Sequence, residues 1–160
     1  MKKSIIKILL KQGRGKLVEH SLEISKSYSF KSQGSFESGK ILLKNKLYED
    51  SIFMFYYSMY NSLLSLLFYI GVKSENHNFS IFLLNYLFGR KDLSELIFLA
   101  KKERINNQYY VNGEKDINFL KSKVKNLFED SEEFILEIKA LIINLNKQEI
   151  IKLRKKFKEL

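Results

Sequence analysis

Hydrophobic positions along the chain recur with the spacing of α-helices, most regularly in segment 117–145. There the apolar residues alternate at intervals of three and four, as in a heptad repeat, and the one polar residue in the series is Ser131. The series predicts a long helix that packs lengthwise in a bundle or against a partner subunit. Its apolar members are Ile117, Leu120, Val124, Leu127, Phe134, Ile138, Leu141 and Leu145.

A second long block, residues 51–72, holds 22 positions without a charged side chain. That length would allow a membrane-spanning helix. However, the block contains many hydroxyl and amide side chains, and no basic cluster flanks it. These features favour a central helix over 48–70, buried on nearly all sides and ending at Gly71, and we expect no membrane association.

Shorter amphipathic blocks predict the remaining helices, over residues 2–12, 21–45, 78–88, 92–110 and 147–160. The run Gln12-Gly13-Arg14-Gly15 indicates a flexible joint. With no proline and 7 glycines, the chain is expected to be all-α, with few long elements. We predict three parts: a basic N-terminal helix and joint (1–20), a helical bundle (21–146) and a basic C-terminal helical tail (147–160).

The net charge of +10 is concentrated at the two ends of the chain. Residues 1–20 contain six basic and one acidic side chain, residues 147–160 contain six and two, and the part between them is nearly neutral. Basic ends can attract phosphate backbones without sequence preference. They can equally be solvent-exposed helix faces, and the composition leaves both interpretations open.

Composition excludes several kinds of chemistry. The chain has no cysteine, which rules out disulfides, thiolate catalysis and cysteine metal sites, and favours a cytoplasmic location. Its two histidines, His20 and His77, are far apart, so we expect no metal site. No phosphate-binding glycine loop and no serine-nucleophile signature is present, and no cofactor is expected.

The segment 92–110 carries the strongest candidate for a functional side chain. At helical spacing its inward stripe of apolar residues continues into Arg104, then Asn107 and Gln108. A guanidinium at the edge of a core needs an anion or several hydrogen-bond acceptors. Arg104 could therefore hold a phosphate, a carboxylate or helix carbonyls.

The central segment offers partners for this arginine. Tyr57 and Asn61 share one stripe, which places Asn61 inside the bundle or at a groove edge, where it needs hydrogen bonds. One interpretation is an internal network of Arg104, Asn61 and Tyr109 that holds the bundle in register; the other is a binding site. His77, near the start of the next helix, is either a structural cap or a phosphate contact.

The order of these motifs resembles the HEPN superfamily, in particular its small stand-alone prokaryotic members. The resemblance covers about residues 30–145. It implies an all-α bundle of about five helices that forms a homodimer, often paired with a nucleotidyltransferase antitoxin in toxin–antitoxin or defence loci. The residues that carry it are Asn45 to Ser51, the run Tyr56-Tyr57-Ser58-Met59-Tyr60-Asn61, then Gly71, Lys73 and His77, and finally Arg104 with Tyr109.

Many members of that superfamily are metal-independent ribonucleases that use an arginine and a histidine four to six residues later. Here those positions hold Gln108, Tyr109 and Tyr110, and Asn61 stands where the central helix of the family has a histidine. Glutamine cannot exchange a proton at neutral pH, and a tyrosine is a poor base. We therefore expect a module that binds RNA, a nucleotide or a protein partner. The alternative is a ribonuclease toxin that uses Arg104 with His77 or Tyr109.

Overall fold

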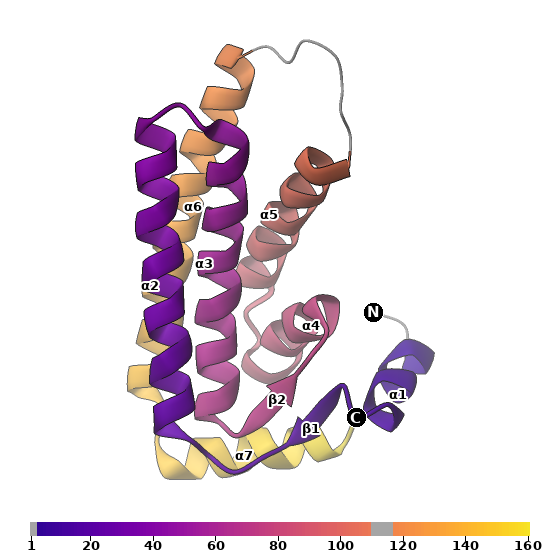
Figure 1. The fold of residues 1–160 in the computed structure, drawn as a ribbon. Helices are drawn as coiled ribbons and strands as arrows, with labels where there is room; N and C mark the ends of the chain where they lie inside the picture. The colour runs from indigo at the N-terminus through magenta and orange to yellow at the C-terminus, as the bar shows by residue number, and fades with distance from the viewer. Residues whose placement is uncertain (1–2, 110–116) are drawn as a thin grey trace.

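The computed structural model describes residues 3–109 and 117–160, and the side chains of Lys3, Gln108 and Tyr109 lie outside this description. The described part is built from helices and two short strands (Figure 1). The all-α prediction is confirmed, and the predicted helix boundaries agree with the observed ones to within a few residues. The elements are α1 (Lys3–Lys11), β1 (Gly15–Leu17), α2 (Leu22–Lys44), α3 (Tyr48–Tyr69), β2 (Val72–Ser74), α4 (His77–Phe88), α5 (Lys91–Tyr109), α6 (Ile117–Asn144) and α7 (Lys147–Lys158).

Helices α2, α3 and α6 stand side by side, α5 leans against α3 and α6, and α7 crosses beneath (Figure 1). The heptad series of α6 faces the core as predicted, with Val124, Phe134 and Ile138 fully buried. Its first member, Ile117, is an exception and is 67% exposed. The series therefore packs over most of its length inside this chain.

Helix α3 is the central rod of the bundle and is buried on nearly every side, as its uncharged sequence predicts. Among the described helices, none combines the length and apolarity needed to cross a bilayer. The apolar side chains of α3 instead face the other helices. Its fully buried members include Ile52, Phe55, Tyr56, Met59, Leu63, Leu66 and Leu67.

Small residues bring α2 close to α3. The Ser25 hydroxyl donates to the Ser65 carbonyl at 2.9 Å, and the Ser32 hydroxyl donates to the Ser58 carbonyl at 2.8 Å. Seven residues further along each helix, the Ser51 hydroxyl donates to the carbonyl of Gly39 at 2.8 Å. The interface therefore has one antiparallel register, repeated every seven residues, in which each hydroxyl satisfies a carbonyl of the facing helix.

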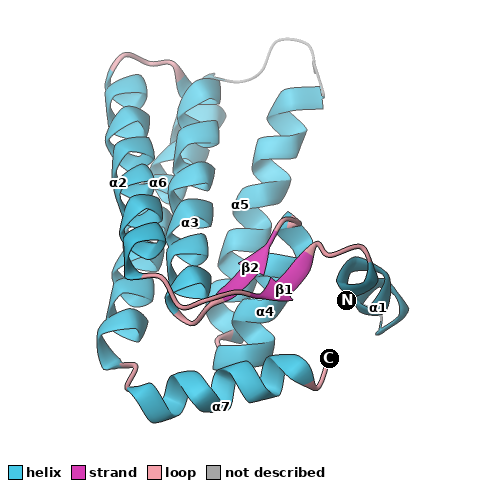
Figure 2. Cartoon of the chain, turned by 60° about the horizontal axis from the view of Figure 1, so that its bottom comes forward, coloured by secondary structure: helices cyan, strands magenta, loops and turns pink. Residues whose placement is uncertain are grey.

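The predicted joint at residues 12–15 forms a turn that leads into strand β1, which pairs with β2. The strands are antiparallel, with Gly15 opposite Ser74 and Leu17 opposite Val72 (Figure 2). Gly13 makes the turn into β1 with a φ of +68°, a conformation that favours glycine. A three-residue strand that pairs across more than 50 positions leaves no periodic pattern in its own sequence, so the strand pair could not be predicted.

Helix α7 packs against the lower end of the bundle. It begins at a capping box in which Asn146 and Glu149 each bind the other's backbone N–H. Its one buried side chain is Phe157, which packs in the core edge to face against Phe79 of α4. The exposed Lys152 and Lys155 account for part of its positive charge.

Candidate functional site

Aromatic and basic side chains from α3, α4 and α5 meet in one cluster. Tyr56 and Tyr60 lie one turn apart on α3, so both rings point to the same side. His77 is the first residue of α4, and its position follows from the Asn76 side chain, which caps that helix by accepting from the Phe79 N–H at 3.0 Å. Arg104 enters from α5.

The imidazole of His77 is held by the two tyrosines. Its Nδ1 is hydrogen-bonded to the Tyr56 hydroxyl. Its ring stacks on Tyr60 with a centroid distance of 3.9 Å and an interplanar angle of 8°. These contacts fix both the position and the plane of the imidazole.

The protonation states of His77 and Tyr56 follow from burial and from nearby charges. Burial, and then the charges of Arg104 and Lys101, lower the pKa of His77 to about 4, so the ring is neutral near pH 7. Burial also raises the pKa of Tyr56 well above its usual value, which keeps its phenol protonated. Among the described residues, Nδ1 is the acceptor of that buried O–H, so we assign the His77 proton to Nε2.

Arg104 lies over the phenol rings of the same cluster. Its guanidinium carbon is 5.4 Å from the centre of the Tyr56 ring and 6.0 Å from that of Tyr57, and its Nη1 donates weakly to the Tyr57 hydroxyl at 3.5 Å. Its Nε is buried without a hydrogen-bond partner in the described part of the chain. The guanidinium therefore has unused hydrogen-bonding capacity.

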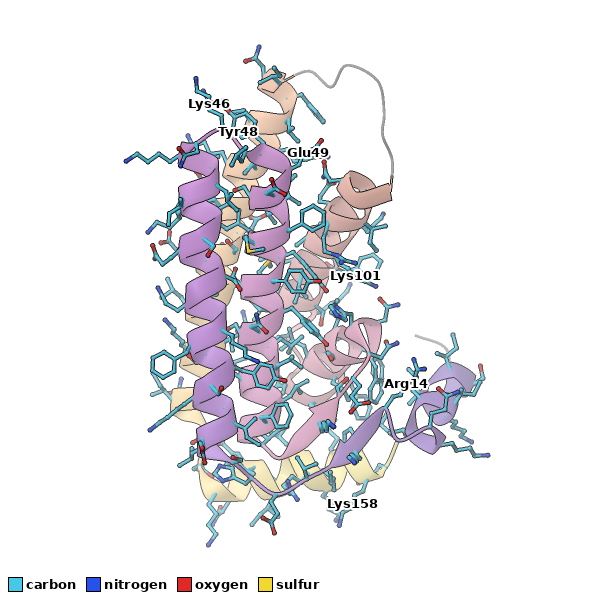
Figure 3. All side chains as sticks on the ribbon, in the orientation of Figure 1. Arg14, Lys46, Tyr48, Glu49, Lys101 and Lys158 are labelled. Atoms are coloured by element: carbon cyan, nitrogen blue, oxygen red, sulfur yellow. The ribbon has the colours of Figure 1, made fainter. Side chains whose placement is uncertain are left out.

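Lys101 adds a second cation one turn before Arg104 on α5. Its ammonium group donates a hydrogen bond to the Asn78 side chain, next to His77, and Figure 3 shows Lys101 on α5 near the start of α4. Burial, and then the Arg104 charge, lower the pKa of Lys101. Two neighbouring cations that repel each other would each be stabilised by a shared anion.

Three of the residues singled out in the sequence, Arg104, His77 and Tyr57, meet in this cluster. Asn61 lies one turn beyond Tyr57 on α3, is half-buried, and forms no hydrogen bond with Arg104 in the described residues. The Asn107 side chain donates to the Glu103 carbonyl of its own helix at 2.8 Å. The side chains of Gln108 and Tyr109 fall outside the described part.

The sequence analysis did not single out Tyr56, Tyr60 or Lys101. A signal existed for each of them. Tyr56 and Tyr60 are four residues apart within a motif already noted, and Lys101 precedes Arg104 by three, on the same face of a helix. The missing information was that the Tyr56 side of α3, rather than the Asn61 side, faces α4.

The chemistry of the cluster suits an anion. It offers the guanidinium of Arg104, the ammonium of Lys101 and the Nε2–H of His77, all of which are donors. Both charged groups that shift the His77 pKa are positive. Within the described residues, no group of three or more His, Asp or Glu side chains is arranged to hold a metal ion.

Comparison with known proteins identifies the family of this chain. The model of the HEPN domain matches residues 26–141, which include the cluster on α3, α4 and α5. No curated protein sequence matches the chain. Residues 1–25 and 142–160, which hold α1, β1 and α7, lie outside the matched range. Because the matched range covers most of its length, the chain belongs to the HEPN domain family.

Proposed function

We propose that this HEPN protein binds a phosphate group of RNA or of a nucleotide at the cluster of Arg104, Lys101 and His77, as a binding module of a prokaryotic toxin–antitoxin or defence system. The observation that carries the proposal is the guanidinium of Arg104, which lies over the rings of Tyr56 and Tyr57 and beside a second cation, Lys101. A phosphate supplies both the negative charge and the acceptor oxygens that these donors require.

The proton state of His77 supports binding in preference to catalysis. A general base must present a free lone pair to the hydroxyl that it activates. With Nδ1 accepting from Tyr56, the other ring nitrogen of His77 is Nε2–H, which is a donor. In this state His77 contributes a hydrogen bond to a phosphate oxygen and does not accept the 2′-hydroxyl proton of RNA.

The test is a comparison of Arg104→Ala with Lys102→Ala, which removes an exposed cation from the same helix. Binding of short single-stranded RNA and of nucleoside phosphates is measured by fluorescence anisotropy and calorimetry. We expect Arg104→Ala to weaken binding about tenfold or more, in line with the loss of charge-assisted hydrogen bonds. Lys102→Ala should leave affinity close to that of the wild type. Equal affinities of Arg104→Ala and the wild type would contradict the proposal.

A second candidate function is a metal-independent ribonuclease toxin. It is favoured by the presence of Arg104 and His77 in the same cluster, since an arginine and a histidine could share the work of phosphate stabilisation and proton transfer. Incubation of the protein with total RNA in the presence of EDTA tests it. Cleavage that disappears in both Arg104→Ala and His77→Gln would replace the binding proposal with this one, whereas intact RNA would exclude it.

The expected homodimer and the nucleotidyltransferase antitoxin partner belong to the same proposal. Sedimentation of the purified chain measures the first. Co-purification with the product of a neighbouring nucleotidyltransferase gene, if the genome holds one, measures the second. A monomer that binds no such protein would leave phosphate binding as the sole function proposed.

A further inference from the structure

The two segments outside the matched HEPN range meet at the end of α3. The guanidinium of Arg154, on α7, donates through Nη1 to the carbonyls of Val18, Ile70 and Gly71, at 2.9, 2.9 and 3.0 Å. Val18 follows β1, and Ile70 and Gly71 form the turn between α3 and β2. One nitrogen thus joins the N-terminal segment, the central helix and the C-terminal helix.

The turn at Gly71 is shaped to accept this contact. Gly71 has a φ of +71°, and a Cβ added there would lie 1.9 Å from the Arg154 Nη1. The Val18 N–H donates back to the Gly71 carbonyl at 2.9 Å. The carbonyls of Ile70 and Gly71, which follow the last residue of α3, are therefore satisfied by the two added segments.

From this turn the chain leads directly to His77. Strand β2 ends at Ser74 and is paired along its length with β1, and the Glu75 N–H donates to the Arg14 carbonyl at 2.8 Å. Arg14 lies where α1 gives way to β1 (Figure 3). Asn76 then caps α4, whose first residue is His77. Hydrogen bonds therefore fix the backbone from the Gly71 turn as far as the Asn76 cap, immediately before His77.

The added segments also touch the first turn of α4 itself. Phe79, two residues after His77, is fully buried. Gly15 of β1 lies against its ring so closely that an added Cβ would be 2.2 Å from the Phe79 Cε1. From α7, Phe157 packs edge to face on the same ring at a centroid distance of 6.5 Å. The Phe79 ring is therefore packed between β1 and α7.

We infer that Arg154 is a positioning residue for the cluster: through the Gly71 turn and β1, helix α7 and residues 14–18 hold His77 against Tyr56 and Tyr60. The two basic ends then have a role inside the fold that differs from attraction of a nucleic acid. The inference rests on the proposed function only where it concerns ligand affinity. The placement of His77 is measurable without any ligand.

The experiment follows the imidazole signals of His77 by NMR in the full chain, with His20→Gln to assign the only other histidine. We expect Arg154→Met to raise the His77 pKa from about 4 by one unit or more, towards its ordinary value of 6.5, because the ring loses its burial. The matched control is Lys155→Met, which removes an exposed cation next to Arg154. It should leave the His77 pKa unchanged.

A second variant acts on the same segment from the N-terminal side. Gly15→Ala should displace Phe79 and raise the His77 pKa in the same direction, and Arg154→Lys offers a milder change if Arg154→Met does not fold. The inference is overturned if these variants lower the unfolding midpoint but have the same His77 pKa as the control Lys155→Met. If the wild type binds no RNA or nucleotide while Arg154→Met still shifts His77, the positioning role stands and the proposed function falls.

Discussion

The two opposite faces of α3 are both polar, but they are built in different ways. On one face, Ser51, Ser58 and Ser65 recur every seven residues against α2, where serine hydroxyls donate to carbonyls across the interface. On the other face, Tyr56 and Tyr60 hold His77 and lie beside a guanidinium whose Nε has no partner in the described chain. On the serine face the hydrogen-bonding groups are paired across the interface, whereas on the tyrosine face the buried Nε of Arg104 is left unpaired in the described residues.

The difference shows how a buried helix can serve both as scaffold and as site. Small side chains allow two backbones to approach closely, which leaves no room for a ligand between them. Large aromatic side chains hold neighbouring helices further apart and present ring faces and hydroxyls to charged groups. We therefore expect substitutions on the serine face to change stability, and substitutions on the tyrosine face to change binding and pH response.

The largest expected effect on stability comes from the serine face. Gly39→Ala would place a Cβ 2.7 Å from the ring of the buried Phe55, which should cost roughly 1–3 kcal/mol of unfolding free energy through overpacking. Gly34→Ala is the matched control on the same helix, since an added Cβ there meets nothing within 4 Å. It should stabilise by up to about 1 kcal/mol. Urea unfolding of both variants measures the contrast, and similar effects would refute the close α2–α3 packing.

The tyrosine face should give the protein a stability that depends on pH. The His77 pKa lies below its ordinary value, so the folded state favours neutral imidazole. The resulting stability is fully present above about pH 6.5 and is lost as the pH falls towards 4. Because the ring is only half-buried, we expect a loss of roughly 1–2 kcal/mol. In urea titrations at pH 7 and 4.5, His77→Gln should flatten this dependence, and His20→Gln should retain it.

The smallest expected effect on stability is that of Arg104→Met. The buried Nε of Arg104 is not compensated by a hydrogen bond in the described residues, so its removal should change the unfolding free energy by less than about 1 kcal/mol, with either sign. The same variant should lose the phosphate affinity proposed above. A large destabilisation without any loss of binding would show that Arg104 serves the bundle register, which was the other interpretation of its sequence pattern.

The helices of this protein could be predicted from the sequence because their signals are local. The heptad series of α6 and the uncharged run of α3 each define a helix within a window of some 20 to 30 residues. Arg104 was found in the same way, as a charged residue on an otherwise apolar stripe. The serine register between α2 and α3 was also present as a spacing of seven in both helices, although it was not recognised in advance.

The sequence by itself thus determined the helices, their order and the arginine that must find a partner, since helical periodicity and turn residues act over a few positions. Tertiary structure decided which side of α3 receives α4, and therefore that Tyr56 and Tyr60 hold His77. It also decided the pairing of β1 with β2 and the docking of Arg154 on the Gly71 turn. These contacts join residues 17 to 136 positions apart, and they depend on the packing of the whole chain.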